Sequence, residues 1–116
     1  MSNIERPARP RTYSSPARAG VRLLGAEIAR ERKRAAVTAA DLAERARISL
    51  VTLRKVERGE PSVAIGTVFE VAVLLGLDLL GTPEQVRDRT GRAQESLALL
   101  PARVRHRAAG EVDDDF

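Results

Sequence analysis

The side chains with the clearest chemistry lie in the run SLVTLRKVER, residues 49–58. On a helix, residues three and four apart share a face, so Leu53 and Val56 would point together toward a core. The opposite face would carry two apolar and three basic side chains: Leu50, Val51, Arg54, Lys55 and Arg58. Arg and Lys donate to guanine O6 and N7 in the DNA major groove, and small apolar groups contact the thymine methyl. The run suits a helix that reads base pairs, although a solvated helix with two exposed apolar residues is the alternative.

Two capped helices would hold these side chains. Thr38 is suited to cap a helix over 38–46, with Asp41 in a capping-box-like position three residues later. Ala46 to Ile48 then make a turn, and Ser49 is the next N-cap, for a helix over 49–57 that Gly59 ends in the left-handed conformation. Two short helices joined by about three residues are typical of a helix-turn-helix.

The remaining pattern predicts three more helices and an all-α fold. Aromatic residues are only 3% of the chain, and Ala, Leu, Arg and Glu dominate. The first helix would run over 18–35. The fourth would start at Ser62 or Val63 and end at Gly76, with an inward face made of Ile65, Val68, Ala72 and Leu75. Thr82 before Pro83 predicts a fifth helix over 83–98.

The 116 residues allow one small domain with tails. We expect a disordered basic arm over 1–17, a helix-turn-helix domain over 18–80, a further helical segment over 81–100 as the candidate for dimerisation, and a flexible tail over 101–116. The first 20 residues hold four arginines against one glutamate, which suggests a polyanionic partner. The chain has no cysteine, no long uncharged apolar run and no leader pattern, so we expect a cytoplasmic protein with no membrane partner.

An enzyme is the main alternative class of protein, and the sequence has few residues that could form an active site. There is no cysteine, His106 is the one histidine, and no glycine-rich phosphate loop or His/carboxylate cluster is present. The acidic run 113–115 lacks the glycine and distal glutamate of a calcium loop. We therefore expect no catalytic residue, no metal and no cofactor.

Several motifs at regular intervals, DLAERARIS, TLRKVERGE and VAVLLGLD, resemble the Cro/phage-repressor (XRE) family. The resemblance covers about half of the chain and implies a five-helix lambda-repressor-like helix-turn-helix domain that binds double-stranded operator DNA as a repressor. In that family, residues at the positions of Thr38 and Ala39 contact phosphate, and those at Leu50, Val51, Arg54 and Lys55 read bases. The full set of expected DNA-binding residues is Thr38, Ala39, Ser49, Leu50, Val51, Thr52, Arg54, Lys55 and Arg58.

One departure from the family pattern bears on specificity. The family often has Gln or Ser at the positions of Leu50 and Val51, so this chain has fewer hydrogen-bonding groups there. We expect Arg54 and Lys55 to supply the readout, helped by thymine-methyl contacts and DNA shape. The resemblance also implies a structural ion pair between Arg32 and Glu57, linking the first helix to the end of the reading helix.

The C-terminal part suggests a narrower role. The run LLPARVRHR and the final DDDF are similar to the ends of HipB-like antitoxins, which are encoded beside a HipA-like kinase toxin. In this interpretation the last four residues, Asp113, Asp114, Asp115 and Phe116, dock on that partner. A solitary XRE-family regulator and a protein-only adaptor that has lost DNA binding are the alternatives. We expect a homodimer, because one short helix contacts too few base pairs to select a site.

Overall fold

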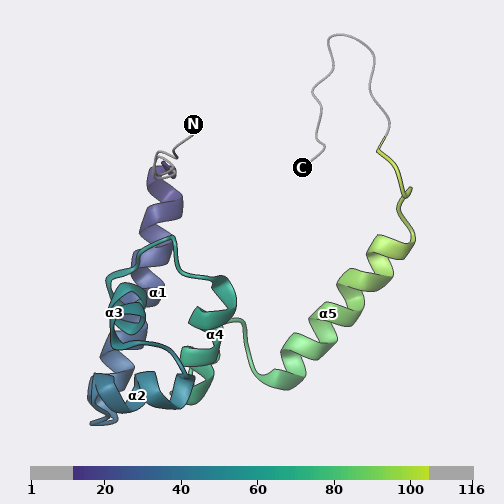
Figure 1. The fold of residues 1–116 in the computed structure, drawn as a ribbon. Helices are drawn as coiled ribbons and strands as arrows, with labels where there is room; N and C mark the ends of the chain where they lie inside the picture. The colour runs from purple at the N-terminus through teal and green to yellow at the C-terminus, as the bar shows by residue number, and fades with distance from the viewer. Residues whose placement is uncertain (1–11, 105–116) are drawn as a thin grey trace, which may run out of the picture. The chain divides into compact units, whose positions relative to one another are not determined.

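The computed structural model describes residues 12–104, which form five α-helices. These are α1 (Ser15–Arg34), α2 (Ala39–Ala46), α3 (Leu50–Arg58), α4 (Ile65–Leu74) and α5 (Pro83–Ala98) (Figure 1). The predicted all-α class and number of helices are confirmed. The predictions for residues 1–11 and 105–116, including the acidic end and Phe116, lie outside the described residues.

Most helix ends follow the capping residues that the sequence offers. The hydroxyl oxygens of Thr38, Ser49 and Thr82 accept a backbone N–H three residues on, at 3.0, 3.0 and 3.1 Å. At α5 the Gln85 side chain also accepts the Thr82 N–H, which completes a capping box. Gly59 ends α3 in the left-handed conformation, with φ of 73°. These local predictions are confirmed.

Two helix starts differ from the prediction. α1 begins three residues earlier than expected, because Ser14 accepts the Ala17 N–H and caps the helix, so the predicted arm over 1–17 extends into α1. α4 begins later, at Ile65, and its N-cap residue Ala64 has no side-chain capping bond. Ile65 is 74% exposed, so its predicted place on the inward face is wrong.

Helices α1 to α4 form one compact unit, which ends at Leu79. α3 packs against α1 and α2, and α2 packs against α4 (Figure 1). The core holds Leu42 and Ala43 from α2 and Leu53 and Val56 from α3, of which the two α3 residues were predicted above to face inward. The other core residues are Ile28, Val71 and Ala72. The described part of the second unit, residues 80–104, contains α5, which has no buried residue.

The described helices are short or strongly charged. Within residues 12–104, none is both long enough and apolar enough to cross a membrane.

Candidate nucleic-acid interface

Helices α2 and α3 are joined by three residues, 47–49, in the arrangement that the sequence predicts. The turn depends on Arg47, which has a left-handed backbone (φ 60°, ψ 42°) and donates its N–H to the carbonyls of Ala43 and Glu44. Ile48 also donates to the Ala43 carbonyl, at 3.0 Å, and packs its side chain against the core. Ala46, predicted to lie in the turn, is the last residue of α2. The turn therefore fixes the angle between the two helices.

The outer face of α3 carries the side chains expected to contact DNA. Leu53 and Val56 are buried, which places the opposite side of the helix outward. Val51 is 63% exposed and Leu50 is 37% exposed, while Arg54 is exposed and Lys55 is half-buried. These four side chains share the outer face, so the helix presents two cations beside two apolar groups.

Ser49 and Thr52 form hydrogen bonds to each other at the start of α3. The Ser49 hydroxyl accepts the Thr52 N–H at 3.0 Å and donates to the Thr52 hydroxyl at 3.0 Å. Thr52 is half-buried and Ser49 is exposed. Both hydroxyls contribute to the cap, so each has less capacity for a base edge than an unpaired hydroxyl would have.

Arg58, at the end of α3, has an acidic neighbour that our reading of the sequence did not consider. Its Nε and Nη2 donate to Glu60 Oε2 at 3.0 and 2.7 Å. The Arg58 side chain is 58% exposed, so the pair is solvated and can exchange for another anion at small cost. The separation of two residues does not by itself predict this pair, because side chains two residues apart do not face each other on a helix.

The start of α2 offers backbone donors rather than side chains. The Thr38 hydroxyl accepts the Asp41 N–H, which occupies it as a cap. Ala39 is half-buried and packs against the core, so its side chain is directed inward. A phosphate at this helix end would be met by backbone N–H groups and the positive end of the helix dipole.

Arg32 joins α1 to both parts of this surface. Its Nε and Nη2 donate to the two carboxylate oxygens of Glu57 at 2.6 and 3.0 Å, and its Nη1 donates to the Val37 carbonyl at 3.0 Å. Both ion-pair side chains are largely buried, at 13% and 14% exposure. The hydrogen bond to Glu57 raises the pKa of Arg32, against the opposing effect of burial. One guanidinium therefore contacts the end of α3 and the residue before the α2 cap.

Two glycines allow α1 and α3 to approach closely, which the sequence analysis missed. A Cβ on Gly25 would lie 2.5 Å from the Val56 carbonyl oxygen and 2.8 Å from that of Glu57. A Cβ on Gly59 would lie 2.5 Å from the Arg22 Cα. Each glycine is thus needed because backbone from the other element occupies the space of a side chain.

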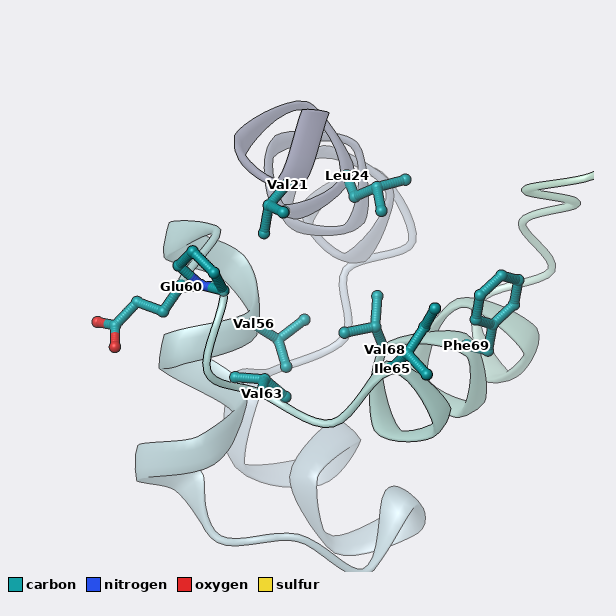
Figure 2. A pocket seen from close by; sticks show the side chains of 10 residues that line it. Val21, Leu24, Val56, Glu60, Val63, Ile65, Val68 and Phe69 are labelled. Carbon is teal, nitrogen blue, oxygen red and sulfur yellow. The ribbon is translucent and has the colours of Figure 1, made fainter. Parts of the chain in front are cut away.

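The unit also has an apolar cleft of about 230 Å³ between α1, the end of α3 and α4 (Figure 2). Val21, Leu24, Val63 and Phe69 line it, and the Glu60 carboxylate points away from the hollow. The lining residues offer no nucleophile and no general base directed into the cleft. Within residues 12–104 there is also no group of three His, Cys, Asp or Glu residues that could hold a metal ion.

The comparisons with known proteins agree with this geometry. A family model described as a helix-turn-helix domain matches residues 23–90, more than half of the chain, and spans α2, the turn and α3. No curated protein matches the chain significantly. The extent of the model match, together with the capped helix pair, shows that the chain belongs to the helix-turn-helix domain family.

Proposed function

We propose that this protein is a sequence-specific repressor that binds double-stranded DNA through α2 and α3. The observation that carries the proposal is the outer face of α3, where Arg54 and Lys55 lie beside exposed Val51 on a helix whose other side is anchored in the core. A helix of this width fits the major groove, which is about 12 Å wide.

Helices α2 and α3 would make different contacts with the DNA. The N-terminus of α2, at Thr38 and Ala39, approaches a phosphate through its backbone donors and sets the register on the duplex. Arg54 and Lys55 then donate to base edges, and Val51 contacts a thymine methyl. The Arg32–Glu57 ion pair keeps α3 at the required angle to α2.

The test uses a DNA sequence selected from a random library by the wild-type protein. Arg54→Ala and Lys55→Ala should each weaken binding to the selected sequence by about 1 to 3 kcal/mol, or roughly 5- to 150-fold, because a base contact is lost. Arg22→Ala is the matched control, because Arg22 is an exposed cation on α1. Equal losses on selected and random DNA would contradict base reading at these positions.

A protein-only adaptor is the second candidate, favoured by apolar Leu50 and Val51 on the outer face and by the Arg58–Glu60 pair. The dependence of DNA binding on salt concentration distinguishes the two functions. Phosphate contacts make DNA affinity fall steeply with ionic strength, whereas an adaptor would retain no DNA at any salt concentration.

Two finer proposals concern partners. We propose a homodimer, supported by the exposed leucines at the end of α5 and beyond it: Leu97, Leu99 and Leu100. Footprinting should then show two half-sites about 10 base pairs apart, or a multiple of that. A single half-site bound by a monomer would exclude it.

We further propose that the protein is the autoregulatory antitoxin of a kinase-type toxin encoded beside it, a role that rests on the sequence of residues 99–107 and 113–116. Removing residues 111–116 should weaken binding to the neighbouring gene product and leave DNA affinity unchanged. If both forms bind that product equally, residues 113–116 are not the docking site. If neither form binds it, the protein is a solitary regulator.

A further inference from the structure

A second group of cations lies at the end of α1, outside the helix pair. The last turn of α1 contains Arg32, Lys33 and Arg34. Arg32 is directed inward to Glu57, whereas Lys33 and Arg34 are exposed. Arg34 Nη1 lies 3.6 Å from Glu31 Oε1 with the Arg34 side chain 72% exposed, and Lys33 has no ion pair with any residue in 12–104. The two exposed charges are therefore scarcely neutralised.

The favourable position of a cation at a helix C-terminus does not fully account for this pair. Such a cation typically contributes about 0.3 to 1 kcal/mol, and Arg32 already supplies one. The carbonyls of Glu31, Arg32 and Lys33 accept backbone N–H groups from residues 35, 37 and 36, at 3.0, 3.1 and 3.0 Å. Since backbone donors satisfy these carbonyls, neither exposed side chain is required as a cap.

The turn after α1 holds these cations in a fixed relation to the start of α2. Val37 donates its N–H to the Arg32 carbonyl, and Arg32 Nη1 donates to the Val37 carbonyl at 3.0 Å. Val37 immediately precedes Thr38, the cap of α2. These two hydrogen bonds tie the last turn of α1 and the residue before the α2 cap into one corner, in which the exposed Lys33 and Arg34 lie four to five residues before Thr38.

We propose that Lys33 and Arg34 contact DNA phosphates next to the phosphate that the N-terminus of α2 approaches. This inference rests on the proposed DNA-binding function and extends the interface from the helix pair to the end of α1. Flexible, solvated cations are suited to this task, because phosphate oxygens lie along the whole backbone and the contact needs no base identity. The corner would then add affinity and register, while α3 supplies specificity.

The experiment measures DNA affinity as a function of salt for the full chain. The slope of log K against log salt concentration is negative, and each phosphate contact adds about 0.9 to its magnitude. Lys33→Gln combined with Arg34→Gln should therefore make the slope shallower by about 1.8. Binding to selected and random DNA should weaken by the same factor. Lys33→Arg combined with Arg34→Lys should keep the slope, because both charges remain. Arg22→Gln is the control for loss of an exposed cation elsewhere on α1, about three turns before Lys33.

Thermal stability of each variant, measured alongside, separates the alternatives. If the double Gln variant keeps the wild-type slope, or if Arg22→Gln makes the slope shallower by as much, the proposed contact is overturned while DNA binding by α3 stands. A lower melting temperature with an unchanged slope would assign the two cations to the helix dipole instead. If the wild-type protein binds no DNA at any salt concentration, both this inference and the proposed function fail.

Discussion

Gly25 offers the sharpest test of how α1 positions the reading helix. A Cβ at this position would lie 2.5 Å from the Val56 oxygen, 2.8 Å from the Glu57 oxygen and 2.8 Å from the Gly59 nitrogen. All three atoms belong to the backbone, so no rotamer change can relieve the overlap. Since ordinary van der Waals contact begins near 3.4 Å, the Gly25→Ala variant would have to separate α1 and α3 by about 0.9 Å.

The expected cost follows from two opposing effects. Overpacking of this kind costs about 1 to 3 kcal/mol, whereas replacing a mid-helix glycine by alanine contributes about 1 kcal/mol through helix propensity. Because backbone takes all of the overlap, we expect a cost near the upper limit and a net loss of about 2 kcal/mol. For a domain of this size that loss lowers the melting temperature by roughly 10 °C.

Gly20 provides the matched control on the same helix. A Cβ there would meet nothing within 4 Å, so Gly20→Ala should raise the melting temperature by several degrees through propensity alone. The assay is thermal unfolding followed by circular dichroism, together with binding to selected and random DNA. Gly25→Ala should reduce binding to the selected sequence more than to random DNA, because the displaced α3 no longer matches the base edges. If the two variants are stabilised equally, the close approach of α1 and α3 is refuted.

Two further predictions test other contacts. Removing either partner of the ion pair, by Arg32→Ala or Glu57→Ala, should cost about 1 to 3 kcal/mol in urea unfolding, and the double variant should cost less than the sum, because each single change leaves a largely buried partner unpaired. If the single variants lose little stability and their losses simply add in the double variant, Arg32 and Glu57 act as two independent charges. Replacing Leu97 and Leu100 together by Gln should abolish the proposed dimer in analytical ultracentrifugation and leave the melting of the four-helix unit unchanged, since neither leucine is in its core. A dimer that persists would place the interface elsewhere.

The caps could be predicted from the sequence because their determinants are local. Thr38, Ser49 and Thr82 each bond a backbone N–H three residues on, and Gly59 adopts a backbone angle that few other residues tolerate. Such contacts need no knowledge of the rest of the fold. The inward faces of α2 and α3 were predictable for a related reason, since helical periodicity alone separates Leu42 and Leu53 from their polar neighbours.

The errors arise where packing overrides a local signal. Ser62 precedes an apolar run and resembles a cap, yet the helix starts three residues later at Ile65, behind an alanine that forms no side-chain cap. The later start leaves Ile65 in the first turn and exposed. The need for glycine at position 25 could not be read from its neighbours either, because the atoms that exclude a Cβ come from Val56 and Glu57, about thirty residues away in the chain.

The contacts of α1 explain why residues that need not touch DNA can still govern its recognition. Gly25, Ile28 and Arg32 are spaced three and four residues apart, so they lie on one face of α1. That face contacts α3 near its C-terminal end, through the Val56 and Glu57 carbonyls at Gly25 and through the Glu57 carboxylate at Arg32. The N-terminal part of α3, Leu50 to Arg54, lies outside these contacts with α1 and is held by buried Leu53 and by packing against α2. Because α1 holds one end of α3 and α2 the other, a shift of α1 changes the tilt of the base-reading helix, so the geometry of α1 limits the precision with which α3 can enter a groove.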